Sequence, residues 1–235
     1  TGGSILEYCI AEYGKGLYIT KSGPFIHLSE FRYSSEYGIS VYNDNWSNPT
    51  TLVWITQCDV HDNYVGLKSY ATSTERAVFN YNTVYNNSPK GGIDASYGTT
   101  FSYNTVKNNT YSGEHGDGAG GIYSDRCYIH HNTITNNIMT SSDQVGGLCI
   151  NGGIISDNII SNNTGNYAVY TKSLPSSFTN NIITDGLTSF DNDEINGAYA
   201  NNVFAGGLIG GLEFSSNNAG FSNNTILNSP ENGSF

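Results

Sequence analysis

The side chains that could carry out chemistry gather in the middle of the chain. This cluster consists of Asp94, His115, Asp117, Asp125 and Arg126. Hydrolysis of a glycosidic bond needs two carboxyl groups at a fixed separation, and Asp94 and Asp125 are the candidates for that pair. Aspartate and histidine are also common turn formers in glycine-rich loops, so the same residues could have a purely structural role.

The same cluster could instead abstract a proton from a uronic acid in an elimination reaction. Such a reaction needs a cation that neutralises the sugar carboxylate and a base that removes the neighbouring proton. Asp94, Asp117 and Asp125 could hold Ca²⁺, because carboxylate oxygens are its preferred ligands. The base would be one of three residues, His115, Arg126 or Lys68. Ca²⁺ is the only cofactor that the sequence suggests.

A row of tyrosines offers a third function, which is carbohydrate binding without turnover. Tyr70, Tyr123 and Tyr170 are expected to share an outward face with Lys68, because they occupy alternate positions of equivalent strands. Tyrosine rings stack on sugar rings, whereas charged and amide groups bind hydroxyls and carboxylates. These four residues are therefore the predicted saccharide contacts.

A short repeated stretch has to position all of these side chains. Its clearest copies span residues 79–87 and 101–109, and each reads aromatic, two polar residues, Asn, a small residue, a branched apolar residue and an Asn pair. With the branched residue as the anchor, ten copies about 24 residues apart can be placed. The anchors are Ile10, Tyr33, Val60, Val84, Val106, Ile134, Ile160, Ile183, Phe204 and Ile226. A repeat of this length is too short for two packed helices and suits one solenoid turn of three short strands.

Asparagine stands two residues before the anchor in seven consecutive repeats. These residues are Asn82, Asn104, Asn132, Asn158, Asn181, Asn202 and Asn224. In a parallel solenoid equivalent residues stack about 4.8 Å apart, so each amide can hydrogen-bond the amides above and below it. The first three repeats place Tyr8, Phe31 and Cys58 there instead. The pattern predicts one all-β domain over residues 1–235, a single-stranded parallel β-helix of about ten coils with an internal Asn ladder.

The Asn ladder and the coil length resemble the right-handed parallel β-helices of the pectate lyase-like superfamily. The Phe-x-x-Asn copies at Phe79 and Phe101, and the Gly-Gly-Ile motifs at 91–93 and 120–122, also resemble the repeats of polymorphic outer-membrane and adhesin-like surface proteins. The resemblance implies a right-handed coil and, for an enzyme, a substrate groove on the face beside the longest loops. The superfamily contains lyases, hydrolases, epimerases and proteins without activity, so the resemblance alone selects no function.

Composition argues against several classes of partner. The chain carries 9 Lys and Arg against 20 Asp and Glu, a net charge of −11, so nucleic acids and anionic membrane surfaces are not expected partners. No apolar run reaches 18 residues, so no transmembrane helix is expected. The four cysteines are expected to be free thiols. An extracellular or cell-surface location follows from the resemblance and from the abundance of Asn, Ser, Thr and Gly.

Three functions remain open. The first is a non-catalytic extracellular structural or adhesin-like module, because neither end carries an obvious cap and an uncapped solenoid exposes strand edges. Such a module would be a piece of a longer chain, or it would stack end to end with copies of itself or with neighbouring domains into a fibre. The alternatives are a polysaccharide lyase or glycoside hydrolase acting on an acidic polysaccharide, and a carbohydrate-binding module.

Overall fold

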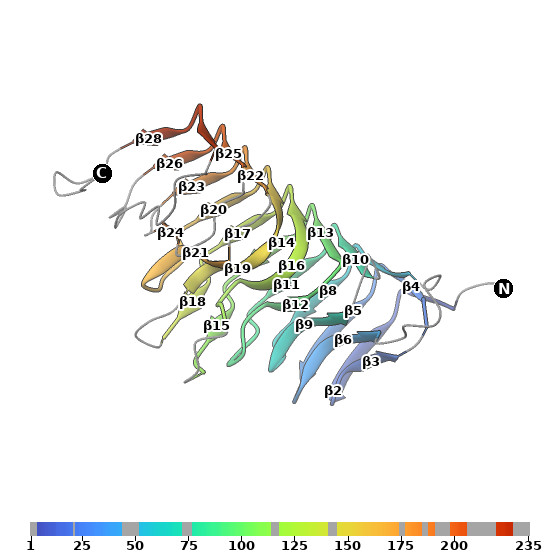
Figure 1. Ribbon diagram of the computed structural model, residues 1–235. Coiled ribbons are helices and arrows are strands. Elements are labelled where there is room, and N and C mark those ends of the chain that lie inside the picture. Colours follow the sequence, from blue (N-terminus) through green and yellow to red (C-terminus); the bar gives the residue numbers. More distant parts are fainter. Residues whose placement is uncertain are drawn as a thin grey trace.

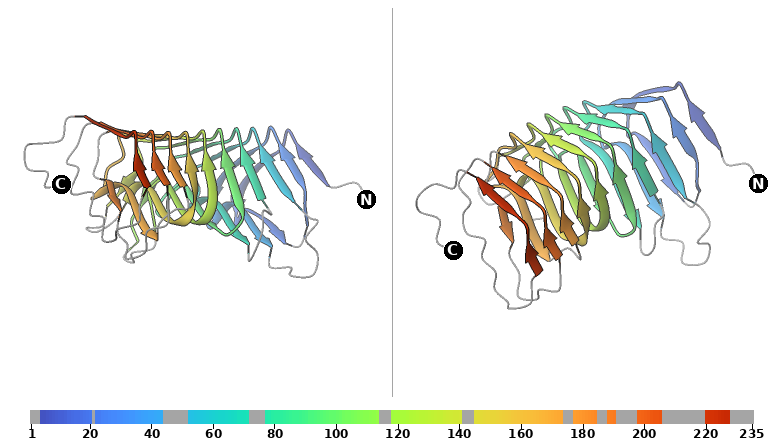
Figure 2. Two further views of the ribbon diagram at one scale, coloured as in Figure 1. Left: turned by 45° about the horizontal axis from the view of Figure 1, so that its top comes forward. Right: turned by 90° about the horizontal axis from the view of Figure 1, so that it is seen from above.

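The computed structural model describes residues 4–20, 22–43, 52–71, 77–113, 118–140, 145–173, 177–184, 188–190, 198–205 and 220–227. Every regular element within these ranges is a β-strand. The chain winds into a rod of stacked coils in which equivalent strands of successive coils pair in parallel (Figure 1). Figure 2 shows the N-terminal strands at one end of the rod and the last C-terminal strands at the other.

Each coil has three faces. The first face contains β1 (Ile5–Glu7), β4 (Phe25–His27), β7 (Val53–Thr56), β10 (Ala77–Asn80), β13 (Thr99–Ser102), β16 (Ile122–His130), β19 (Val145–Ser156), β22 (Ser177–Thr179), β25 (Ala198–Ala200) and β27 (Gly220–Ser222). The second face contains β2 (Ile10–Gly14), β5 (Glu30–Ser34), β8 (Asp59–His61), β11 (Thr83–Tyr85), β14 (Thr105–Lys107), β17 (Thr133–Thr135), β20 (Ile159–Ser161), β23 (Ile182–Thr184), β26 (Val203–Ala205) and β28 (Thr225–Leu227). The third face contains β3 (Leu17–Thr20), β6 (Tyr37–Asn43), β9 (Val65–Ala71), β12 (Ile93–Ser96), the first residues of β16 and β19, β21 (Tyr167–Ser173) and β24 (Thr188–Phe190).

The long strands β16 and β19 run from the third face through a bend onto the first face. The two faces therefore form one 16-stranded sheet, whereas the second face is a separate ten-stranded sheet. Two short strands, β15 (Thr110–Tyr111) and β18 (Ile138–Met139), pair beside the bend that precedes the third face. The parallel β-helix is thus confirmed. The number of complete turns is below the predicted ten, because the third face has strands in only eight coils among the described residues.

The predicted register is wrong in the first two coils. Ala11 and Phe31 pair with each other and then with Val60, so they are the anchors in place of Ile10 and Tyr33. The spacing between coils is uneven here, and Tyr33 instead adopts the left-handed backbone of a bend, with φ 56°. Its ring faces outward. An exposed aromatic residue near the expected position was therefore mistaken for the inward one.

The ladder positions of these coils also differ from the prediction. Cys9 and Ser29 stand there instead of Tyr8 and Phe31, and the backbone N–H of Cys9 donates to Ser29 Oγ at 3.1 Å. Cys58 was placed correctly, since its backbone N–H donates to Asn82 Oδ1 at 3.0 Å. A thiol and a hydroxyl thus replace amides at the N-terminal end of the ladder.

From Asn82 onward the predicted Asn ladder is present. Asn104 Nδ2 donates to Asn132 Oδ1 at 3.0 Å, and the backbone N–H of Asn104 donates to the same oxygen at 2.9 Å. The second hydrogen of Asn104 Nδ2 reaches the Phe79 carbonyl at 2.9 Å. The same pattern joins each ladder residue to the next through Asn224. These buried amides are satisfied by one another and by the strands beside them.

A second ladder, which the sequence reading missed, occupies the next bend. It consists of Asn63, Asn87, Asn109, Asn137 and Asn163, and Asn87 Nδ2 donates to Asn109 Oδ1 at 2.9 Å. The preceding residue of each Asn pair has a different task. Asn86 and Asn108 adopt left-handed backbone with φ 54° and 56°, which asparagine tolerates better than most residues. Each Asn pair therefore makes one bend and one rung.

The interior combines stacked apolar columns with a row of glycines. Phe79 and Phe101 stack with ring centroids 5.0 Å apart and an interplanar angle of 9°. A Cβ on Gly92 would lie 2.8 Å from the Asn109 amide nitrogen and 2.9 Å from Val106 Cγ1, so only glycine lets the third face close against the second ladder. The cysteines among the described residues are free, as predicted.

Candidate functional site

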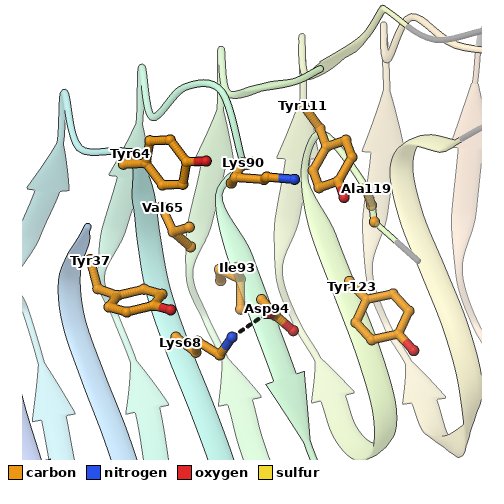
Figure 3. Close-up of a pocket in the computed structure, with 11 residues that line it drawn as sticks. Tyr37, Tyr64, Val65, Lys68, Lys90, Ile93, Asp94, Tyr111, Ala119 and Tyr123 are labelled. Carbon is orange, nitrogen blue, oxygen red and sulfur yellow. Dashed lines mark ion pairs between the residues drawn. The ribbon is translucent and has the colours of Figure 1, made fainter. Parts of the chain in front are cut away.

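A pocket of about 240 Å³ lies on the outward side of the third face (Figure 3). Its floor comes from neighbouring strands, because Lys68 of β9, Asp94 of β12 and Tyr123 of β16 occupy the same register position. Its rim comes from the bends that lead into this face. The full lining is Tyr37, Tyr64, Val65, Lys68, Lys90, Ile93, Asp94, Tyr111, Gly118, Ala119 and Tyr123.

An ion pair holds the Lys68 side chain on the pocket floor. Its Nζ lies 3.2 Å from Asp94 Oδ2 and 5.3 Å from the centre of the Tyr37 ring. Burial lowers the pKa of Lys68, but the Asp94 carboxylate and the Tyr37 side chain together outweigh this, so the pKa of Lys68 lies above its ordinary value. Lys68 is therefore a cation at neutral pH and a poor candidate for a general base.

A second ammonium group enters the pocket from the rim. Lys90 Nζ lies 5.0 Å from the centre of the Tyr111 ring, and the backbones of these two residues pair across the bend. In Figure 3 the Lys90 side chain points across the pocket toward Tyr111. Within the described part of the chain, Lys90 forms no ion pair with a carboxylate.

Asp125 belongs to a separate cluster beside the pocket. Its Oδ1 accepts a hydrogen bond from Asn151 Nδ2 at 3.1 Å, and Arg126 Nε lies 4.0 Å from the same oxygen. The Arg126 guanidinium also lies 5.0 Å from the centre of the Tyr97 ring. Burial raises the pKa of the Asp125 carboxyl above its ordinary value, and Arg126 and a hydrogen bond from Tyr97 partly offset this effect.

The structure brings the predicted catalytic residues together only in part. Asp94 and Asp125 lie on the neighbouring strands β12 and β16, but Asp94 is level with Tyr123 and Asp125 is level with Ser96. This diagonal arrangement places the two residues about 7–8 Å apart. Asp94 is paired with Lys68, and Asp125 lies outside the pocket lining.

The predicted calcium ligands are incompletely placed. His115 and Asp117 lie outside the described residues. Among the residues that are described, no group of three or more His, Cys, Asp or Glu side chains could hold a metal ion. The expected Ca²⁺ remains a prediction.

The predicted tyrosine contacts share the third face but form two patches. Tyr70 stacks on Tyr42 with centroids 5.2 Å apart, whereas Tyr123 lines the pocket. Tyr170 lies two strands beyond Tyr123, with Cys149 between them in register. Cys149 is buried there beneath an outer apolar cluster of Ala119, Val145, Tyr123, Tyr167 and Tyr170. Only Tyr123 and Lys68 of the predicted saccharide contacts therefore reach the pocket.

Four pocket residues were missed by the sequence reading, namely Tyr37, Tyr64, Lys90 and Tyr111. A signal for two of them was present. Tyr64 directly follows Asn63, and Tyr111 lies two residues after Asn109, so both stand just beyond a rung of the second ladder. Without that ladder their position relative to the third face could not be assigned.

None of the described residues belongs to a helix long and apolar enough to cross a membrane. This finding leaves the location of the protein as a prediction.

Comparison with known proteins identifies the fold family. The family model described as the right handed beta helix region matches residues 2–153, which is more than half of the chain. A search of curated proteins and a search of solved structures each found no match. The matched range contains the N-terminal coils, most of the Asn rungs and the pocket. On this evidence the chain belongs to the right-handed beta helix family.

Proposed function

We propose that the chain is a non-catalytic extracellular β-helix module that binds an acidic saccharide in the pocket of the third face. The observation that carries this proposal is the pairing of two ammonium groups with tyrosine rings inside one pocket. Lys68 lies beside Tyr37 and Lys90 beside Tyr111, while Asp94 is the only carboxylate among the described residues of the lining. Tyrosine rings supply stacking surfaces for sugar rings, and the ammonium groups supply partners for carboxylates or sulfates.

The local charge of the pocket contrasts with that of the whole chain. The chain has a net charge of −11, yet the lining, as far as the structure describes it, carries two lysines against one aspartate. A volume of about 240 Å³ is below the ~300–1,000 Å³ of pockets for drug-sized ligands. One or two sugar rings of a longer polymer would therefore occupy it, with the rest of the polymer lying along the third face.

Two features favour binding over turnover. Lys68 is held as a cation by Asp94, which makes it a weak base for proton abstraction. Asp125 accepts a hydrogen bond from Asn151 and lies outside the pocket lining. Among the described residues, an acidic saccharide in the pocket would therefore meet cations and rings, with no free acid and base on either side of one bond.

The direct test is calorimetric titration of the protein with oligogalacturonate, with a neutral oligosaccharide of equal length as the comparison ligand. Lys90→Gln is expected to weaken oligogalacturonate binding by roughly tenfold, which corresponds to the loss of one charge-assisted hydrogen bond. Lys107→Gln is the matched control, because Lys107 Nζ also lies over a tyrosine, 5.8 Å from the Tyr85 ring centre, but on the second face. Equal binding of the neutral oligosaccharide would contradict the proposal.

The enzymatic alternative has its own readout in the same samples. A lyase would generate unsaturated uronates that absorb in the ultraviolet, and a hydrolase would generate new reducing ends. The proposal expects neither from the wild-type protein. Product formation that disappears in Asp125→Asn, with the fold intact by circular dichroism, would replace the binding module with an enzyme.

A second candidate function is end-to-end assembly. Both sheets end at the first coil among the described residues, and all five residues of β2 are exposed. The outer edges of β1, β2 and β3 could therefore pair with the last coil of another copy or with a neighbouring domain. Filaments in electron micrographs of the purified chain would support this assembly, and single short rods at high concentration would contradict it.

A further inference from the structure

The C-terminal half of the second face carries a regular grid of uncharged side chains. Strands β17, β20, β23, β26 and β28 lie side by side there (Figure 1). Their outward positions are Thr133 and Thr135, Ile159 and Ser161, Ile182 and Thr184, Val203 and Ala205, and Thr225 and Leu227. None of these ten side chains is charged or aromatic. We call this surface the uncharged grid.

Three apolar members of the grid are well exposed. Ile159 is 46%, Ile182 is 41% and Leu227 is 48% exposed. Contiguous exposed apolar area is where binding surfaces are often found. The grid therefore offers an uncharged and regular surface to an occupant of matching regularity.

We propose that the uncharged grid binds the surface of an ice crystal. The strands pair in continuous register, so Thr133, Ile159, Ile182, Val203 and Thr225 form one straight column. Neighbouring positions in a column are about 4.8 Å apart, and the two columns are about 6.6–7 Å apart along the strands. A surface with two fixed repeats of this size can match the repeating oxygen positions of a water lattice, whereas an irregular surface cannot.

The side chains of the grid are suited to holding ordered water. Threonine, isoleucine and valine are restricted at χ1, so their methyl and hydroxyl groups keep fixed positions. Ser161 Oγ donates a hydrogen bond to Thr135 Oγ1 at 3.1 Å, which orients both hydroxyls along the stack. Methyl groups order the water around them, and the hydroxyls can join that ordered layer through hydrogen bonds.

Other occupants match the grid less well. Five strands carrying two outward positions each cover on the order of 300 Å², whereas a stable dimer needs about 800 Å² per partner. A saccharide would favour aromatic platforms, and an anion or nucleic acid would need cations. The ten grid positions offer neither. This inference does not depend on the saccharide pocket, which lies on the third face.

The test is ice shaping, thermal hysteresis and inhibition of ice recrystallisation by the purified chain. Ile182→Lys places a charge in the centre of the grid and is expected to abolish these activities. Ile154→Lys is the matched control, because Ile154 is 39% exposed on a strand of the first face. The control should retain the wild-type activities, and circular dichroism should show an unchanged fold in both variants.

Each remaining outcome overturns the proposal. A wild-type chain without effect on ice growth would show that the grid does not bind ice. Equal loss in Ile154→Lys would place the activity elsewhere on the rod. Sedimentation showing a dimer that only Ile182→Lys dissociates would make the grid a protein interface.

Discussion

The two halves of the second face share one backbone and carry opposite surfaces. In the N-terminal half, the outward side chains form a charged network. Arg32 lies 2.7 Å from both Glu12 Oε2 and Glu30 Oε1, and His61 Nε2 lies 2.9 Å from Glu30 Oε1. In the C-terminal half, the equivalent positions are the uncharged grid. The inward positions show no such change, since Val60 in one half and Ile183 in the other are both buried.

This difference shows that the coil constrains only the side chains that point inward. The ladder residues, anchors and glycines recur because each coil packs against the next one. The outward positions are free to vary, so they can carry charge, tyrosines or small hydroxyls on the same frame. Function in this protein should therefore be sought on outward positions, and stability on inward ones.

The largest effect on stability is expected from a substitution in the interior of the C-terminal half. Asn132→Leu removes the acceptor of two hydrogen bonds from Asn104 and the donor to the Phe101 carbonyl and to Asn158 Oδ1. Because buried polar groups are left unpaired, we expect a loss of about 3 kcal/mol in the free energy of unfolding. Urea denaturation measures this value.

The control for Asn132→Leu is its outward neighbour. His131 adopts left-handed backbone with φ 58° and points to solvent. His131→Asn should change the free energy of unfolding by no more than about 0.5 kcal/mol. Equal effects of the two variants would contradict the distinction between inward and outward positions.

The next effect concerns two buried thiols, those of Cys58 and Cys127. Burial raises the pKa of Cys58 to about 11 and that of Cys127 to about 11 from an ordinary 9.0. The folded state therefore holds these protons more tightly than the unfolded state, so their contribution is complete below pH 9 and is lost as pH rises toward 11. Stability should fall across this window. Replacing both residues by alanine should flatten the fall, and an unchanged pH profile would argue against the effect.

A smaller effect is expected from a substitution that extends the Asn ladder toward the N-terminus. Cys58 occupies the ladder position one coil before Asn82. Its backbone N–H donates to Asn82 Oδ1, but its side chain adds no amide donor to that oxygen. Cys58→Asn would add a side-chain donor to the same oxygen, as in every rung below. We expect the free energy of unfolding to rise by about 1 kcal/mol, which thermal denaturation measures. A lower melting temperature would mean that this coil cannot accept the amide.

The smallest effect on stability is expected from removing the cation at the centre of the charged network. Arg32→Gln leaves Glu12 and Glu30 without their cation, but these groups are partly exposed. We expect a loss of at most about 1 kcal/mol, and less in high salt. Denaturation at two salt concentrations checks this, and a large loss that salt does not reduce would mean that the outward network is part of the core.

The fold could be predicted from the sequence because the rungs repeat in type and spacing. Asn82 to Asn224 form an unbroken series, so the coil length and the first ladder follow directly. The first two coils failed because Ala11 is small and Tyr33 is aromatic, and residue type then gave the wrong inward position. The Asn pairs were visible, but only the structure shows that Asn86 makes the bend while Asn87 makes the rung.

The candidate site could be predicted only where it lies on regular strands. Alternation placed Lys68, Asp94 and Tyr123 in one outward row, and their register confirms it. Lys90 and Tyr111 come from bends of variable length, where spacing carries no information about direction. A pocket that combines both kinds of position needs the three-dimensional path of the chain.

The most direct test of this account is a crystal structure of the protein soaked with a galacturonate trisaccharide. We predict a uronate ring between Lys68 and Lys90, with its carboxylate within hydrogen-bond distance of at least one ammonium group and a tyrosine ring against its face. An empty pocket with the sugar bound elsewhere on the rod would contradict the assignment of this outward surface.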